Sequence, residues 1–457
     1  MTQIKILKNL GLFICFGFIL LDPWMIQNPM TPYLNGIFGK LQIVDLLIPF
    51  IFIYLLVYIY STVFTKQVVI PIANNLLIAG MVCILVLSLF SGYLNSILDD
   101  VYVINTLKIG YLLSIYFIFS YFISSNPQIL DRVIIGLALI FLISALISIV
   151  GYLFAYFTQE TNSLAKVYEY FPYIETPTRM LGTFGPTSKV FGFYMFLMSL
   201  ILFLYKNKIN FFFYGLLVFL IVVCAILTIS RVSVWILMFW ILVFLNNFNK
   251  DKYLDLFLIF SVFCIFLLFQ ILTIFHFGDV LNPIFSCTEE YSFGRNQYYG
   301  WLDRPYQCTV SGEFNYTFSS YFLMKVAAFR AWLDMPFFGN GLTSFELIWI
   351  NFALDGNMPM WYTEYVFQLV QNTFLTIMVE QGIISLFLWL SLLLYPLFLV
   401  RKNIVFKKNS FIILMWLVFM LIIMIDLDIQ NFRFTYYLFP VIHALLGFSF
   451  LKHDTAR

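Results

Sequence analysis

Long apolar segments recur along nearly the whole chain, with short polar turns between them. A helix needs roughly 20 apolar residues to cross the hydrocarbon core of a bilayer, and on that count the sequence predicts twelve spanning helices. Composition agrees, because 62% of the residues are hydrophobic and 11% are charged, whereas soluble domains are roughly one quarter charged. We therefore expect an all-α polytopic membrane protein with spans at 9–27, 43–63, 69–91, 101–124, 133–157, 186–205, 210–229, 232–248, 254–275, 380–400, 409–426 and 433–451.

The apolar run over 210–248 is too long for one crossing, and we interpret Ser230 and Arg231 in its middle as a tight turn between two helices. An even number of spans places both termini on one side of the membrane. Lys and Arg are enriched in short cytoplasmic loops, and Lys5, Lys206 and Arg401 fall on the side of the termini. We therefore expect cytoplasmic termini and a long loop on the outer side.

This topology divides the chain into three regions. Residues 1–275 hold the first nine spans and a smaller outer loop at 158–186, residues 276–367 form the large outer loop, and residues 368–457 hold the last three spans.

The large outer loop is predicted to carry short amphipathic helices. Four apolar residues recur there at helical spacing and favour a helix that lies either on the membrane or on the bundle; they are Phe322, Val326, Phe329 and Leu333. Thr343 and Glu346 have the spacing of a capping box, which predicts a second short helix.

Two of the six cysteines, Cys287 and Cys308, fall in this same loop. An oxidising compartment would let them form a disulfide, which we expect. The alternative is a pair of free thiols.

Basic residues at the outer ends of the spans are the clearest candidates for ligand binding. Arg231 lies between two apolar helices, where a charge usually has an anionic partner or a ligand, and its planar fork of donors suits phosphate or carboxylate. The alternative is an interfacial arginine that reaches to lipid headgroups. Arg330, Arg179 and Lys189 are further candidates, and together these cations would suit a pyrophosphate whose lipid tail lies in the membrane.

Acidic residues near the same ends are candidates for proton transfer. Asp426 and Asp428 end one span and Arg433 begins the next, so a local ion pair is the alternative reading. Glu380 stands at the mouth of a span and could act as a base if burial raises its pKa, although an interfacial carboxylate is the simpler interpretation.

Several classes of chemistry lack support in the sequence. His276, His443 and His453 are far apart and have no metal-ligand spacing. There is no nucleophile elbow and no Walker loop, so we expect no metal and no cofactor. A net charge of +2 without long basic runs gives no reason to expect nucleic acid as a partner.

Four short motifs follow one another in the chain: Arg179-x-x-Gly182-Thr-Phe-Gly-Pro, Ser230-Arg231 between two spans, Arg330-x-Trp332 leading into Phe338-Gly-Asn340-Gly, and Gln371-Asn372 followed by nine residues and then Gly382. In these motifs and in its layout the chain resembles the O-antigen ligase and O-antigen polymerase superfamily. These are bacterial membrane glycosyltransferases that use glycans linked to undecaprenyl pyrophosphate.

The resemblance implies a metal-independent transfer at the periplasmic face of the bacterial inner membrane. The partners would be a lipid-linked oligosaccharide donor and acceptor, membrane lipids and a chain-length regulator. Arginines matching Arg231 and Arg330 would hold the pyrophosphate of the donor and improve it as a leaving group.

The chain departs from the ligase pattern at Gln371, where ligases have a histidine. Glutamine can orient a hydroxyl by hydrogen bonding but cannot take its proton. This favours a polymerase, in which the acceptor is the terminal sugar of another lipid-linked repeat, and leaves Glu380, Asp426 or Asp428 as the candidate base.

We therefore expect a surface polysaccharide polymerase with catalytic residues Arg231, Arg330, Gln371, Glu380 and Asp426, and with substrate contacts at Arg179, Lys189, Trp332, Asn340, Asn372 and Asp428. A ligase or O-oligosaccharyltransferase of the same superfamily is the nearest alternative. A lipid-linked oligosaccharide flippase is the alternative from another class; transporters usually place charges near the bilayer midplane and show repeats, whereas these charges cluster at the outer ends and no repeat is found.

Overall fold

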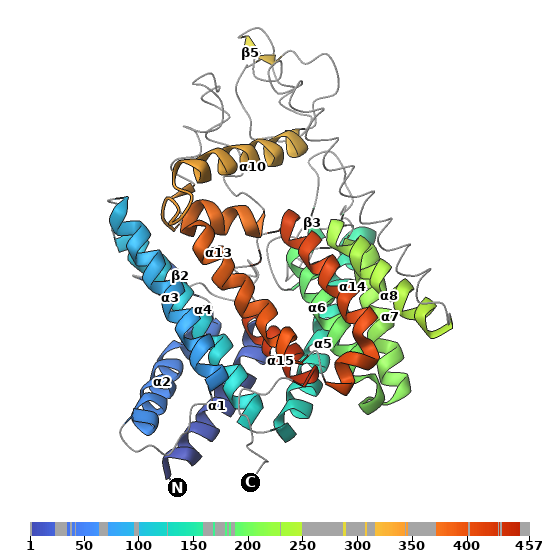
Figure 1. The fold of residues 1–457 in the computed structure, drawn as a ribbon. Helices are drawn as coiled ribbons and strands as arrows, with labels where there is room; N and C mark the ends of the chain where they lie inside the picture. The colour runs from blue at the N-terminus through green and yellow to red at the C-terminus, as the bar shows by residue number, and fades with distance from the viewer. Residues whose placement is uncertain are drawn as a thin grey trace.

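The computed structural model describes a helical bundle (Figure 1). The described residues are 2–22, 34–36, 39–41, 43–63, 72–95, 100–125, 127–158, 168–169, 179–180, 182–183, 188–228, 230–248, 287–288, 307–308, 316–342, 344–345, 372–400, 403–427, 429 and 432–447.

The α-helices in this part of the chain are α1 (Thr2–Leu21), α2 (Ile48–Val63), α3 (Ile72–Leu94), α4 (Asp100–Ser125), α5 (Pro127–Thr158), α6 (Ser188–Tyr205), α7 (Phe211–Thr228), α8 (Arg231–Phe248), α10 (Tyr316–Asp334), α13 (Thr373–Val400), α14 (Ile404–Asp426) and α15 (Arg433–Leu445). There are also two 3-10 helices: η2 (Ile43–Leu47) directly precedes α2, and η3 (Lys206–Lys208) lies between α6 and α7. Short strands form three antiparallel pairs: β1 (Leu34–Gly36) with β2 (Gly39–Leu41), β3 (Tyr168–Glu169) with β4 (Arg179–Met180), and β5 (Cys287–Thr288) with β6 (Gln307–Cys308).

The predicted helical fold is confirmed, whereas the predicted number of spans is not. Among the described residues, 7 helices are long and apolar enough to cross a membrane. They lie at Val44–Thr62, Thr106–Ser124, Gln128–Phe154, Lys189–Lys208, Phe211–Thr228, Thr373–Leu397 and Lys407–Ile425, and Ile78–Leu94 and Arg231–Leu245 are shorter apolar helices. The predicted span at 254–275 lies outside the described residues.

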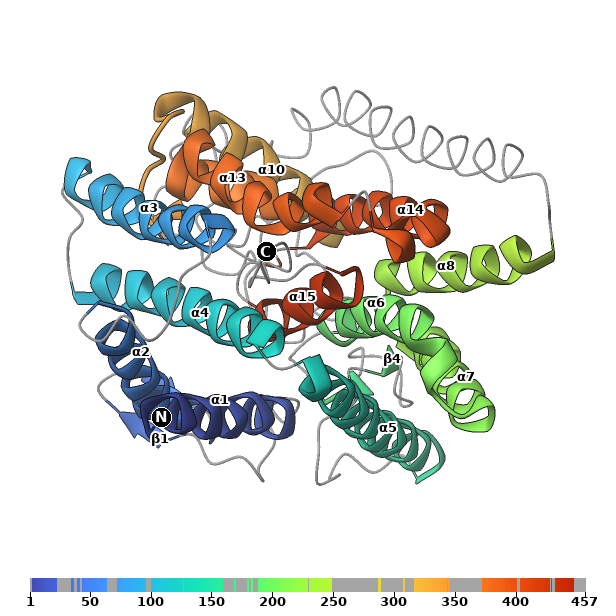
Figure 2. The same ribbon diagram turned by 60° about the horizontal axis from the view of Figure 1, so that its bottom comes forward.

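Helix α15 occupies the centre of the bundle, between α4 and α6 (Figure 2). It has 13 residues, which rise roughly 20 Å, less than the thickness of a hydrocarbon core. All residues from Phe434 to His443 are buried. By contrast, α2, α5 and α7 expose large apolar side chains such as Phe52, Val150 and Phe219, as helices facing lipid do.

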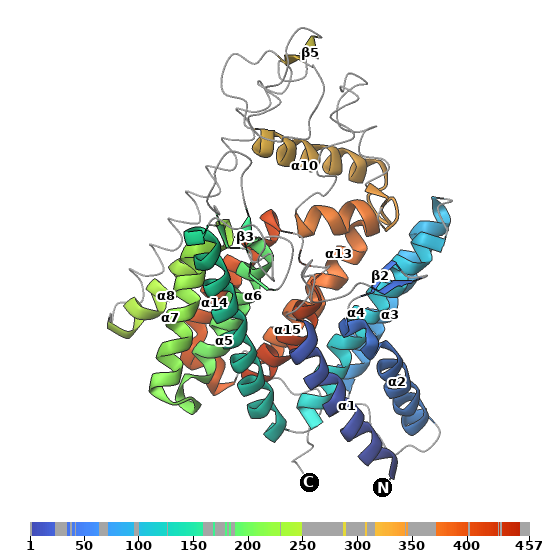
Figure 3. The same ribbon diagram turned by 180° about the vertical axis from the view of Figure 1, so that it is seen from behind.

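Helix α13 bends at Gly382, whose φ of 80° and ψ of 173° interrupt the helix. Its first segment lies beneath α10, which runs across this end of the bundle, opposite to the start of α1 (Figures 1 and 3). The second segment contains Pro396, which cannot donate to the carbonyl of Leu392. The Tyr116 hydroxyl donates to that carbonyl instead, at 3.2 Å, and so ties α4 to α13.

Helix α10 lies where the amphipathic helix of the large loop is predicted, and the two members of its apolar stripe whose side chains are described do not face the bundle. Ala327, Ala328 and Ala331 are fully buried and α10 packs against α13, whereas Phe329 and Leu333 are exposed. Small alanine side chains allow close approach of the two helix backbones, and this contact decides which face is covered. The second short helix, predicted to open with Thr343 and Glu346, lies largely outside the described residues.

Candidate functional site

Four helices begin close together, next to the α10–α13 contact, and we call this end of the bundle the outer end, after the side that the predicted topology gives it. Helix α6 meets the start of α8, where a side chain at Gly192 would touch the Ser230 hydroxyl at 3.1 Å. The Phe193 ring lies 5.9 Å from that of Phe434 at the start of α15. Thr373, the first residue of α13, bonds to the segment that leads from α14 to α15. Helix N-termini carry partial positive charge, so the outer end favours an anion.

The turn before α8 is built from hydroxyl groups. The Ser233 hydroxyl lies 2.7 Å from that of Thr228 and 2.8 Å from that of Ser230, and the Ser230 carbonyl accepts from the Ser233 amide at 2.9 Å. These bonds close the turn between α7 and α8, which confirms the predicted break at Ser230 and Arg231. Arg231 is the first residue of α8 and its side chain is exposed at the outer end.

The Arg179 motif lies against the same group of helices. Its strand β4 contacts α5 and α7, and Arg179 pairs in register with Glu169. Gly182 has a φ of 80°, and a side chain there would overlap the Phe191 ring of α6. The Thr183 hydroxyl is hydrogen-bonded to that of Ser144. The side chain of Arg179 lies outside the described residues, and Lys189, in the first turn of α6, is half-buried.

The Gly339 turn after α10 interlocks with the bend of α13. Both Gly339, at a φ of 71°, and Gly382 face the backbone of the other segment so closely that a side chain on either would overlap it. The amide of Ile383 donates to the Pro336 carbonyl at 3.0 Å, and the Ser91 hydroxyl of α3 donates to the Gly339 carbonyl at 3.0 Å. The motif glycines thus form a rigid joint between α3, α10 and α13.

Asn340 and Trp332, two residues predicted to contact the substrate, donate hydrogen bonds to backbone carbonyls within this joint. The Asn340 side chain, which is buried, donates to the carbonyls of Ala331 and Val379 at 2.9 and 3.2 Å. The Trp332 indole donates to the Pro336 carbonyl at 3.0 Å. Arg330 is exposed on α10 beside this joint.

Asn372 and Glu380, two of the predicted amide and acid residues, lie at opposite ends of the first segment of α13. Asn372 caps α13, since its side chain accepts from the Leu375 amide at 3.0 Å. Glu380 is buried at the other end of the first segment of α13, roughly 12 Å along the helix axis. Asp426 ends α14 beside the start of α13, but its side chain, Gln371 and Asp428 lie outside the described residues.

An ionic cluster inside the bundle was not predicted. Arg433 pairs with Asp45 of η2, 388 positions away, with nitrogen–oxygen distances of 3.1 and 3.4 Å. The guanidinium also lies 5.9 Å from the centre of the Tyr111 ring. Asp22, which is fully buried, accepts from the Tyr437 hydroxyl at 3.1 Å.

Arg433 thus has a carboxylate partner far away in the sequence, whereas the local pair with Asp426 or Asp428 involves side chains that lie outside the described residues. Arg433 stands at the positive end of α15, so both the helix dipole and its own charge favour a nearby carboxylate. Asp45 supplies that carboxylate from a distant part of the sequence. The signal that could have revealed it is the presence of Asp22 and Asp45 in or beside apolar segments, where an acid needs a partner.

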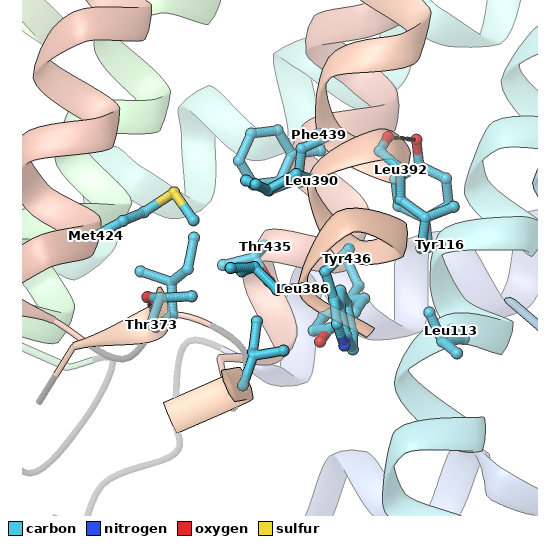
Figure 4. A pocket seen from close by; sticks show the side chains of 14 residues that line it. Leu113, Tyr116, Thr373, Leu386, Leu390, Leu392, Met424, Thr435, Tyr436 and Phe439 are labelled. Atoms are coloured by element: carbon cyan, nitrogen blue, oxygen red, sulfur yellow. Dashed lines mark hydrogen bonds between the residues drawn. The ribbon is translucent and has the colours of Figure 1, made fainter. Parts of the chain in front are cut away.

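The cavity between α4, α13, α14 and α15 has a volume of about 30 Å³ (Figure 4). Its wall is apolar apart from a few groups such as the Thr373 and Thr435 hydroxyls. A space of this size holds a water molecule but not a sugar ring. We therefore place the candidate substrate site at the outer end and not in this cavity.

The two cysteines of the large loop occupy opposed backbone positions. Cys287 of β5 is the register partner of Cys308 in β6. Opposed residues of an antiparallel pair have β-carbons at roughly 4.5–5.5 Å, near the separation that a disulfide requires. The disulfide between them stays a prediction.

A comparison with models of known protein families finds none that matches this chain, and no curated protein sequence is significantly similar to it. The resemblance to the O-antigen ligase and polymerase superfamily therefore rests on the four motifs and on their order along the chain.

Proposed function

We propose that the chain is a polymerase of a bacterial surface polysaccharide, acting on glycans linked to undecaprenyl pyrophosphate at the periplasmic face of the inner membrane. The observation that supports this is the meeting of separate motifs at the outer end. The turn at Gly182, the turn at Arg231 and the cap at Asn372 come from three distant parts of the chain.

In the proposed reaction the acceptor hydroxyl attacks the first sugar carbon of the donor. The bond between that carbon and the phosphate oxygen breaks, and undecaprenyl pyrophosphate leaves with the electron pair. Arg231 and Arg330, with Arg179 and Lys189, stabilise the charge that develops on the pyrophosphate. A carboxylate takes the proton of the acceptor hydroxyl, while Gln371 orients it.

The buried ionic cluster favours transport of a lipid-linked glycan as a second candidate function. Ionisable groups inside a bundle often mark a transport pathway; Asp22 is fully buried, and the side chains of Asp45 and Arg433 are 10% and 14% exposed. A transporter would move the lipid-linked repeat across the membrane without lengthening it.

Surface glycan from a strain that lacks this protein tests the proposal. We expect lipid A core carrying a single repeat in that strain, and a full ladder when the wild type is restored. Arg231→Ala should leave the single repeat, whereas Arg132→Ala, a matched change at an exposed arginine on α5, should restore the ladder.

Other outcomes identify the alternatives. Bare core together with long polymer on undecaprenyl pyrophosphate would indicate a ligase. An unchanged ladder in the deletion strain would rule out polymerisation, and single repeats retained on the cytoplasmic side would indicate a transporter.

A further inference from the structure

Helix α1 ends beside a carboxyl group that lies inside the bundle. Asp22, which directly follows α1, is fully buried, and its Oδ2 accepts from the Tyr437 hydroxyl at 3.1 Å. Its other oxygen, Oδ1, is also buried and has no hydrogen-bond partner among the described residues. Buried polar atoms in native structures are almost always hydrogen-bonded, so Oδ1 points to a small species that binds at this oxygen.

Buried aromatic rings lie around Asp22. Tyr437 and Tyr194 both interact with its carboxyl group. The Tyr437 ring stacks on the Phe119 ring of α4 with centroids 5.4 Å apart, and the Tyr194 ring of α6 meets the Phe434 ring edge-on at 5.6 Å. All four rings are buried. An ionised carboxylate is costly in such surroundings unless a positive charge compensates it.

The guanidinium that could compensate Asp22 is shared with a second carboxylate. Arg433 attracts Asp22, but it is bound to Asp45 at nitrogen–oxygen distances of 3.1 and 3.4 Å. The described titratable groups that face Asp22 are Arg433 and Tyr437 of α15, Asp45 of η2, Tyr111 of α4 and Tyr194 of α6. Tyrosines ionise near pH 10 and are neutral at physiological pH. With both carboxylates ionised, the described part of this cluster therefore carries one net negative charge, two negative charges against one positive.

We propose that this cluster is a proton-binding site and that Asp22 is the residue that takes up the proton. The proton adds to a carboxylate oxygen of Asp22, and no other covalent bond changes. With Asp22 neutral, one carboxylate remains for one guanidinium. Proton uptake also removes the attraction between Asp22 and Arg433, so Asp45 of η2 alone then holds Arg433 at the start of α15. This inference does not depend on the proposed polymerase function.

Infrared spectroscopy of the purified protein during a pH titration tests the proposal. A protonated carboxyl group has a carbonyl stretch that an ionised carboxylate lacks. An ester-free detergent avoids the overlapping band of lipid esters, and isotope-labelled aspartate separates aspartic acid bands from those of Glu380 and other glutamates. We expect one aspartic acid band to appear at a pH clearly above the value of roughly 4 at which exposed aspartates take up protons.

Three variants assign that band. Asp22→Asn should remove it, whereas Asp131→Asn, a matched change in the exposed pair with Lys208, should leave it in place. Asp45→Asn is a second test that does not require Asp22→Asn to fold. Because Arg433 is then left for Asp22, the titration should move to lower pH by about 1 unit or more, as an adjacent opposite charge does for a carboxyl group.

A band that survives in Asp22→Asn, or a band that appears only where exposed aspartates titrate, would overturn the proposal. A titration that is unchanged in Asp45→Asn, or that moves to higher pH, would overturn it as well. Loss of the band when Na⁺ is raised at constant pH would place a metal cation at Oδ1 instead of a proton, which also contradicts the proposal. Glycan synthesis does not enter these readouts, so a failure of the proposed polymerase function leaves them unchanged.

Discussion

Replacing Asp45 with asparagine removes the carboxylate that pairs with Arg433 while keeping the shape of the side chain. The two side chains are 10% and 14% exposed, so water screens the pair little. Removing one partner of such a pair costs about 3–5 kcal/mol, because the other charge stays buried. Arg433 also attracts Asp22, so we take the lower end, about 3 kcal/mol, or roughly 100-fold in the unfolding equilibrium.

Reversible unfolding in mixed micelles, followed by tryptophan fluorescence, measures this change. Asp131→Asn is the matched control, since Asp131 pairs with Lys208 at 2.8 Å on the surface, where the side chains are 42% and 61% exposed. An exposed pair contributes little, so this control should lose less than about 1 kcal/mol. A loss in Asp45→Asn no larger than in Asp131→Asn would refute the reasoning.

The double variant Asp45→Leu with Arg433→Met removes both charges. Apolar replacement of a whole buried ion pair is often neutral or stabilising. We therefore expect the double variant to recover most of the stability that Asp45→Asn loses. A double variant that is less stable than Asp45→Asn would show that the pair is more than a matched set of buried charges.

Three further changes test other parts of the structure. Gly382→Ala should lower stability by at least about 1 kcal/mol, because the positive φ disfavours a side chain, and an unchanged melting temperature would contradict the interlocked joint. Tyr116→Phe should cost about 1 kcal/mol and less in a Pro396→Ala background, where a restored amide bonds to the Leu392 carbonyl while the hydroxyl keeps its contact with Nδ1 of His443 at 3.2 Å; equal costs in a double-mutant cycle would argue against this. Thiol titration of the denatured, unreduced protein should find two of the 6 cysteines unreactive in the wild type, and Cys287→Ser should free the thiol of Cys308; full reactivity of all thiols would rule out the disulfide.

The helices could be predicted from the sequence because long apolar segments have few alternatives to helix in a membrane. The break at Ser230 and Arg231 was predictable for the same reason, since a run of that length exceeds one crossing. The predicted number of spans is not confirmed, and α15, which begins with the predicted segment 433–451, has 13 residues, fewer than a crossing needs.

Contacts between distant segments could not be predicted from local patterns. The stripe that includes Phe329 and Leu333 left open whether the helix lies on the membrane or on the bundle; in the structure three alanines of α10 are buried, α10 packs against α13, and Phe329 and Leu333 are exposed. Asp45, a partner of Arg433, lies 388 positions away in the sequence, and no local pattern indicates that contact.

Within the candidate site, the sequence does not predict which hydrogen bonds the polar residues make. Asn340 and Asn372 are polar residues near motif glycines, and nothing in their spacing distinguishes a sugar contact from a backbone contact. In the structure the Asn340 side chain donates to a backbone carbonyl in the joint, and the Asn372 side chain caps helix α13. Thr373 was not singled out, since its partners lie more than 50 positions away.

The central claim is that this chain joins lipid-linked repeats at its outer end. Purified protein in proteoliposomes, given a single repeat on undecaprenyl pyrophosphate, tests it most directly when glycan length and released carrier are measured together. We predict products of two and more repeats with one carrier released for each new bond, and a rate at least about 100-fold lower for Arg231→Ala. Glycan that never exceeds one repeat, or an unchanged rate in Arg231→Ala, would contradict the account.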